Sequence, residues 1–140
     1  MASNQTEHYG LNQWAAEDPV LREEFNRDFQ LLDEILTGKG NCKIEVGSYD
    51  GTGTYNSTGA NRLAFDGVPL VVIVHNDTCL FAFHGDGMGQ ILTNGGGWTV
   101  SLNWEGNSVS WYNRDDASKQ MNAPGVRYYY LALLGANGNI

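Results

Sequence analysis

The spacing of apolar residues changes along the chain, from about every fourth position to every second position. Residues 21–36 contain no glycine or proline, and large apolar side chains recur there at intervals of four, four, three and four. These side chains are Leu21, Phe25, Phe29, Leu32 and Leu36. Because this spacing places them along one side of an α-helix, the segment predicts an amphipathic helix.

The predicted helix has recognisable start and stop signals. Asp18 can cap free backbone N–H groups, and Pro19 is tolerated at the first helical position, where its missing N–H is not needed. Gly38 and Gly40 are typical of a helix end. A lone helix of this length is only marginally stable in water, so its apolar stripe requires cover. The cover could be a sheet face of the same chain, or copies of the helix in a parallel bundle.

After residue 40 the pattern indicates β-strands. Apolar and polar residues alternate, as in Cys42, Ile44 and Val46, which is typical of strands with one buried face. Residues 105–107 read as a tight hairpin between two such runs. About eight strands are predicted, at 43–49, 62–65, 70–75, 79–84, 88–93, 98–104, 108–113 and 126–134. Without further helices to make crossovers, the sheets must be mostly antiparallel.

The predicted fold class is therefore mainly β: an N-terminal amphipathic helix followed by an antiparallel, jelly-roll-like β-sandwich. We expect three parts: an extended arm at 1–17, an oligomerisation or attachment helix at 18–40, and the β-sandwich at 41–140. Tyr9, Leu11 and Trp14 are isolated anchors in the polar arm. Two phenylalanines in the helix stripe fit the wide seam of a homotrimer better than that of a tight dimer.

Composition and charge narrow the classes of partner. The 140 residues carry 8 basic and 16 acidic side chains, a net charge of −8. Such a chain lacks the basic face that nucleic acids and anionic membranes require, so neither is expected as a partner. The longest apolar run, 68–74, is too short to cross a bilayer, and the first ten residues do not resemble a secretory signal.

Metal and cofactor sites are not expected. His75, Cys79 and His84 lie within ten positions of one another, with Asp77 and Asp86 nearby. A strand at 79–84 sends Cys79 and His84 to opposite faces, which does not suit zinc. The glycine-rich segment 85–97 does not open onto a helix, so it lacks the form of a phosphate cradle. Free thiols are the expected state of the two cysteines, since a Cys42–Cys79 bridge needs neighbouring strands.

Catalysis is likewise not expected. No nucleophile motif accompanies the three histidines. Asp115 and Asp116, together with Asp86, could supply the carboxylates for glycoside cleavage, which leaves a glycan hydrolase as an alternative. Adjacent acidic residues in a turn are more often simply solvated.

A glycan-binding surface is the better-supported site. Sugars stack on exposed aromatic rings and form hydrogen bonds with polar side chains. Trp111 shares a face with Val109 and is expected in the core, so Tyr112 points outward. Function tends to reside on loops, and the loop after Tyr112 is polar. The candidate glycan-binding residues are Trp98, Tyr112, Asn113, Arg114, Asp115 and Asp116.

Two parts of the chain resemble small tail-associated proteins of phages and prophages of Gram-positive bacteria. Residues 9–36 are similar to an arm followed by an amphipathic helix in these proteins. The matching residues are Tyr9, Leu11, Gln13, Trp14, Asp18, Phe25, Asn26, Asp28 and Leu32. Residues 47–74 and 104–133 resemble the β domain that follows, most specifically in Gly-Ser-Tyr-x-Gly-x-Gly-Thr-Tyr and Val-Ser-Trp-Tyr. Residues 66–69, Phe29 and Gln30 depart from the pattern.

The resemblance implies a tail-fibre-like structural protein of the virion, which is assembled in the bacterial cytoplasm. It would be a homotrimer that contacts other tail or baseplate proteins and a host-surface glycan. Weak glycan contacts repeated around a three-fold axis would gain avidity. Besides a tail-borne glycan hydrolase, a scaffold without its own ligand is the other alternative.

Overall fold

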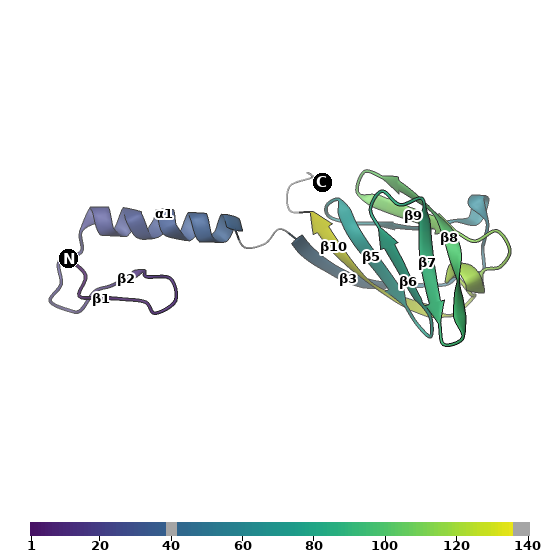
Figure 1. Cartoon of the computed structure of the whole chain (residues 1–140), viewed down its shortest axis with the longest axis horizontal. Helices are drawn as coiled ribbons and strands as arrows, with labels where there is room; N and C mark the ends of the chain where they lie inside the picture. The colour runs from purple at the N-terminus through teal and green to yellow at the C-terminus, as the bar shows by residue number, and fades with distance from the viewer. Residues whose placement is uncertain (39–41, 136–140) are drawn as a thin grey trace. The chain divides into compact units, whose positions relative to one another are not determined.

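The computed structural model describes residues 1–38 and 42–135. The chain divides into two compact units, Met1–Asn41 and Cys42–Ile140 (Figure 1). The first unit holds two short paired strands, β1 (Asn4–Gln5) and β2 (Asn12–Gln13), and the helix α1 (Arg22–Gly38). The second unit holds the large sheet.

The helix begins at Arg22 and not at Asp18, because the Asp18 carboxylate is bonded elsewhere. It accepts hydrogen bonds from the backbone N–H groups of Ser3 and Ala15, both at 2.8 Å. A hydrogen bond from the Ser3 hydroxyl, followed by these two backbone bonds, lowers the pKa of Asp18 below its ordinary value. Asp18 therefore organises the arm instead of capping the helix.

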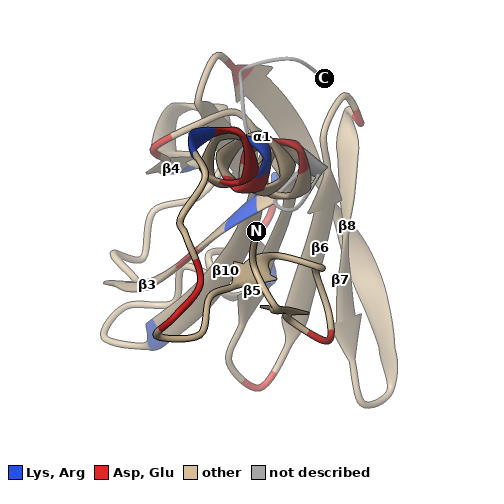
Figure 2. Cartoon of the chain, turned by 90° about the vertical axis from the view of Figure 1, so that its left-hand side faces the viewer, with Lys and Arg blue, Asp and Glu red and all other residues tan. Residues whose placement is uncertain are grey.

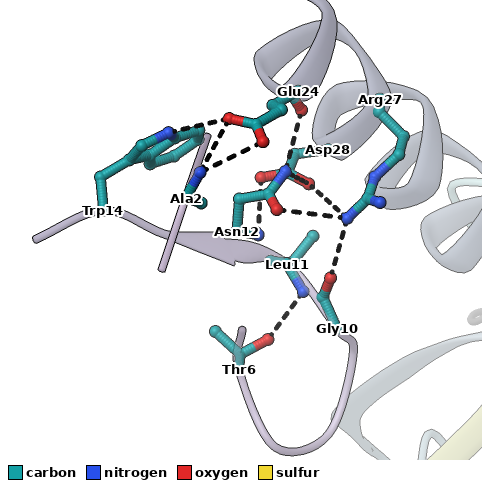
Figure 3. A network of polar contacts seen from close by, with 9 residues as sticks. All are labelled: Ala2, Thr6, Gly10, Leu11, Asn12, Trp14, Glu24, Arg27 and Asp28. Carbon is teal, nitrogen blue, oxygen red and sulfur yellow. Dashed lines mark hydrogen bonds and ion pairs between the residues drawn. The ribbon is translucent and has the colours of Figure 1, made fainter. Parts of the chain in front are cut away.

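The arm is folded against its own helix and is not extended, which corrects the sequence-based expectation (Figure 3). The Asn12 side chain donates to an Asp28 carboxylate oxygen at 3.0 Å and to the Glu24 carbonyl at 3.3 Å. Trp14 donates its indole N–H to Glu24 at 3.2 Å, and its ring lies 6.4 Å from that of Phe25. The arm thus satisfies polar groups on one side of α1.

Over residues 42–135, the second unit forms an antiparallel sheet of eight strands, so the chain is mainly β as predicted (Figure 1). The strands are β3 (Cys42–Asp50), β4 (Asn61–Ala64), β5 (Pro69–His75), β6 (Cys79–Phe83), β7 (Met88–Thr93), β8 (Gly96–Glu105), β9 (Ser108–Tyr112) and β10 (Arg127–Gly135). Their order across the sheet is β3-β10-β5-β6-β7-β8-β9-β4. All eight predicted strands are present, and the hairpin at 105–107 joins β8 and β9.

The sheet is curled, so that strands far apart in its order meet across the core. Tyr49 of β3 lies 6.2 Å, ring to ring, from Trp111 of β9, although five strands separate them in the sheet. Asn61 of β4 donates a 3.3 Å hydrogen bond to the Tyr49 hydroxyl. The concave face holds the buried core, which includes Val72, Val74, Leu80, Ile91, Val100, Val109, Trp111, Ala132 and Leu134.

The convex, outer face of the sheet has two chemically different halves. On β3, β10, β5 and β6 the outward side chains are mostly apolar, and β5 and β6 carry no Lys, Arg, Asp or Glu (Figure 2). On β8, β9 and β4 they are mostly polar, and Asn103, Ser110 and Arg62 lie side by side in one row. The polar half carries the candidate site described next.

Candidate binding groove

A groove of about 400 Å³ lies on the polar half of the outer face. It is lined by Met88, Thr99, Ser101, Tyr112, Asn113, Arg114 and Asp115. Four of the six residues predicted to bind glycan are therefore together in one place. Met88, Thr99 and Ser101 were missed because each looks like an ordinary outward strand residue in the sequence.

Strand register creates the floor of this groove. Met88 of β7 pairs with Ser101 of β8, and Ser101 pairs in turn with Tyr112 of β9. Directly paired residues point to the same face of a sheet, so the three side chains form one row. Thr99 lies two positions before Ser101 and points the same way. The floor thus combines an apolar side chain, two hydroxyls and an aromatic ring.

Asn113 anchors the loop that forms the groove wall. Its side chain donates to the Thr99 carbonyl at 3.3 Å and accepts the Asp115 backbone N–H at 2.9 Å. Its own backbone N–H donates to the Gln120 side chain, also at 2.9 Å. Asn113 is only 9% exposed, so it mainly holds the wall in place and does not offer a free amide.

Gln120 supports the same loop from inside, and the sequence analysis did not single it out. It is fully buried, and its amide group donates to the Gly59 carbonyl at 2.8 Å while its side-chain oxygen accepts from Asn113. Its backbone carbonyl accepts the indole N–H of Trp111 at 2.9 Å. A glutamine in a polar loop is normally exposed, so no sequence signal marks this one.

Trp98 and Asp116, also predicted as glycan contacts, do not line the groove. Trp98 points to the concave face, packs partly against the core, and donates its indole N–H to the Lys119 carbonyl at 2.6 Å. The Asp116 carboxylate accepts the backbone N–H groups of Ser118 and Lys119, at the start of the 3₁₀ turn Ser118–Gln120. Both residues support the loop.

Arg114 and Asp115 supply the charges of the groove. Both are exposed, and neither forms an ion pair within the part of the chain that the structure describes. The open groove thus presents an aromatic ring, hydroxyls, a guanidinium and a carboxylate. This combination suits a polyhydroxylated ligand, which offers apolar C–H faces together with many hydroxyl groups.

No family model matches the chain, and neither a curated protein nor a solved structure matches it. The case for any function therefore depends on the residues and their geometry.

The structure also locates the other residues that were considered for chemistry. Within 1–38 and 42–135, no group of three or more His, Cys, Asp and Glu side chains is placed to hold a metal ion. Cys42 and Cys79 are both free thiols, because β10 and β5 separate their strands. His84 contacts the Pro69 carbonyl and packs on the ring of Trp104. Among the described helices, none has the length and apolar character to span a bilayer.

The predicted oligomerisation residues are largely uncovered within their unit. Leu21, Phe25, Phe29 and Leu36 are 41%, 48%, 58% and 68% exposed, and Leu32 is half-buried. Of the arm anchors, Leu11 and Trp14 are half-buried beside Phe25 and Leu32, whereas Tyr9 is 44% exposed. The arm covers only part of the apolar stripe.

Acid should weaken the groove wall through Asp116. Its hydrogen bonds from Ser118 and Lys119 lower the pKa of the carboxyl below the ordinary value of 3.8. The folded state therefore gains stability from this carboxylate above about pH 3.8, and loses it as pH falls through the lowered native pKa. We expect the NMR shift of the Ser118 amide to titrate below pH 3.8. Asp116→Asn should abolish that titration; an unchanged curve in this variant would assign it to another group.

Proposed function

We propose that the protein is a structural and adhesive component of a phage or phage-derived tail, a tail-fibre-like homotrimer whose β unit binds a host-surface glycan. The observation that carries the adhesive part is the groove, where Tyr112, Arg114 and Asp115 meet the hydroxyls of β8. The resemblance of the arm, helix and β segments to tail-associated proteins supports the structural part. Virion localisation, and contact with other tail or baseplate proteins, belong to the same proposal.

The exposed stripe of α1 supports an assembly role for the first unit. Phe25 and Phe29 stack edge to face, with ring centroids 4.9 Å apart, yet about half of each side chain is open to solvent. Sister helices packed along this stripe would remove that apolar surface from water. Three copies would then present three grooves, and the effective affinity for a repetitive glycan would exceed that of one groove.

The β unit itself would act as a sandwich-like, jelly-roll-like body. Support comes from the meeting of its two halves across one core, shown by the contact between Tyr49 and Trp111. Such a body is rigid, so strands and not mobile segments hold the floor of the groove. Rigid placement reduces the entropy lost when a ligand binds.

Loss of the Tyr112 ring is the direct test of the adhesive function. We expect Tyr112→Ala to weaken binding to a cell-wall polysaccharide array by roughly fivefold per site, because a stacked aromatic contributes about 1 kcal/mol. Asn103→Ala is the matched control, since Asn103 is exposed on the same outer face but does not line the groove. Sedimentation should show the same mass for all three proteins.

Other outcomes of this experiment favour the alternatives. Cleavage of the polysaccharide that is lost in Asp115→Asn would indicate a glycan hydrolase. Equal binding by Tyr112→Ala and by the wild-type protein would contradict the groove. Absence of any glycan binding, with the protein retained in purified tails, would indicate a scaffold.

A further inference from the structure

The apolar half of the outer face is built from three rows of paired side chains. In the first row Ile44, Leu133, Val71 and Phe83 follow one another across β3, β10, β5 and β6. In the second row Val46, Leu131, Ile73 and Phe81 are aligned in the same way. Tyr129, His75, Cys79 and Leu92 form the third. We call these twelve residues the apolar outer face.

This surface is open to solvent within its own unit. Val46 is 69% exposed, Ile44 63%, Phe83 53%, Leu92 51% and Tyr129 49%. The opposite face of the same strands is already the core, where Val72, Val74, Ala132 and Leu134 are fully buried. Strands that are apolar on both faces are typical of sheets covered on both sides.

The absence of charge on this surface allows a second copy of this chain to cover it. The apolar outer face contains no Lys, Arg, Asp or Glu, although the chain carries a net charge of −8. At its end, Asp50 and Arg127 neutralise each other in a two-bond ion pair at 2.8 and 2.9 Å. Two acidic chains can therefore meet through this surface without burying like charges.

The area of this surface also suits the centre of an interface between two protein chains. If each large apolar side chain offers roughly 150 Å², the five most exposed residues alone present roughly 400 Å². A stable interface buries about 800 Å² on each partner, and its centre is the apolar part. A shallow hollow of about 790 Å³, lined by Val46, Ile73, Tyr129 and Leu131 among others, can receive side chains from the other copy.

Beside this surface lies a free sheet edge. Within the described residues, β3 pairs with β10 on one side and with no strand on the other, and it is nine residues long. Long uncovered edges are uncommon in stable monomers, because their unpaired backbone N–H and C=O groups can form hydrogen bonds with a strand of another chain. The edge and the apolar outer face are contiguous, so one partner can cover both.

We infer that the β units of two copies of this chain pack against each other through the apolar outer face and the adjoining edge of β3. This contact is separate from the helix stripe and the glycan groove, and it goes beyond the proposed function.

The test measures mass against concentration by sedimentation of the full-length protein. The Phe29→Glu substitution weakens packing between helices along the apolar stripe. The mass of this variant should still rise with protein concentration, because the β units still associate. Adding Val46→Lys should make the protein monomeric throughout, because a lysine would be buried in the contact. Adding Asn103→Lys, on the polar half, should leave the curve of the Phe29→Glu protein unchanged.

Identical curves for the Phe29→Glu protein with and without Val46→Lys would overturn the inference, whether both are monomers or both associate. Ile44→Lys, at a second exposed position of the same strand, should reproduce the effect of Val46→Lys. The Val46→Lys and Ile44→Lys proteins should have the same thermal unfolding midpoint at low concentration as the Phe29→Glu protein, which would show that they still fold. Glycan binding by the groove is read separately, so the two proposals fail independently.

Discussion

Replacing Gln120 by leucine is expected to lower the free energy of unfolding of the β unit by about 2–4 kcal/mol. The leucine fills a similar volume but leaves the buried backbone N–H of Asn113 without its partner. It also removes one of the two hydrogen bonds that the Gly59 carbonyl accepts, and only the bond from the Thr54 hydroxyl remains. Unsatisfied buried polar groups cost about 1–3 kcal/mol each. Chemical denaturation followed by tryptophan fluorescence measures the change.

The control for this variant is Lys119→Leu, at the exposed neighbouring position. It should change the free energy of unfolding by less than about 0.5 kcal/mol. Because Gln120 holds the wall of the groove through Asn113, Gln120→Leu should also weaken glycan binding under conditions where the protein is still folded. A stability loss as small as that of Lys119→Leu would show that the Gln120 contacts are dispensable.

Gly51→Ala is expected to be at least as damaging, at about 3–5 kcal/mol. A Cβ at this position would overlap the carbonyl oxygen of Ala123 and lie 2.9 Å from the carbonyl carbon of Asn122. Backbone cannot yield as a flexible side chain can, and two hydrogen bonds fix it here: Gly51 to Val126 at 2.8 Å and Gly125 to Gly51 at 3.1 Å. The calorimetric unfolding temperature is the measurement.

Gly87→Ala provides the matched comparison, because nothing lies within 4 Å of a Cβ built at Gly87. This variant should unfold within about 0.5 kcal/mol of the wild-type protein. If the two substitutions proved equally mild, the close approach of the segments around Gly51 and Ala123 would not be required by the fold.

Most strands were predictable because apolar runs and alternation mark them, and turn residues such as Gly106, with a φ of 56°, mark their ends. The alternation around Trp111 reflects a core on one side, since Trp111 is 1% exposed. The alternation around Ile44 located its strand but gave the wrong buried face, because Ile44 and Val46 lie on the outer face and are 63% and 69% exposed. The paired strands of the arm have no such pattern, since Asn4, Gln5, Asn12 and Gln13 are all polar. Side-chain bonds to α1 hold them, and these are not visible in a single sequence.

The candidate site was predictable where it followed strand geometry. Outward-pointing Tyr112 and the polar loop after it do meet in the groove. Trp98 lies outside the groove, in agreement with its alternation in phase with the core residue Val100. Asp116 also lies outside it, because its carboxylate accepts backbone N–H groups within its own turn, and such a carboxylate looks like a ligand-binding one in sequence.

The apolar outer face shows a further limit of pattern reasoning. The continuous apolar runs of β5 and β10 predicted central strands, and both do lie inside the sheet order. The pattern indicates that both faces need cover, but not what supplies it. On the concave face the cover comes from the same chain; on the convex face we attribute it to another copy.

The chain order of the sheet implies an order of folding. Five consecutive strands, β5 to β9, pair with their sequence neighbours, whereas β3 and β10 join residues as far apart as Cys42 and Gly135. Short-range pairings close small loops and form earlier, so the hairpins that carry Met88, Ser101 and Tyr112 should be in place before the β3–β10 ladder. Two of the five strands that carry the apolar outer face, β3 and β10, would thus join the sheet last. A newly made chain would therefore present an incomplete contact surface until its folding is nearly finished.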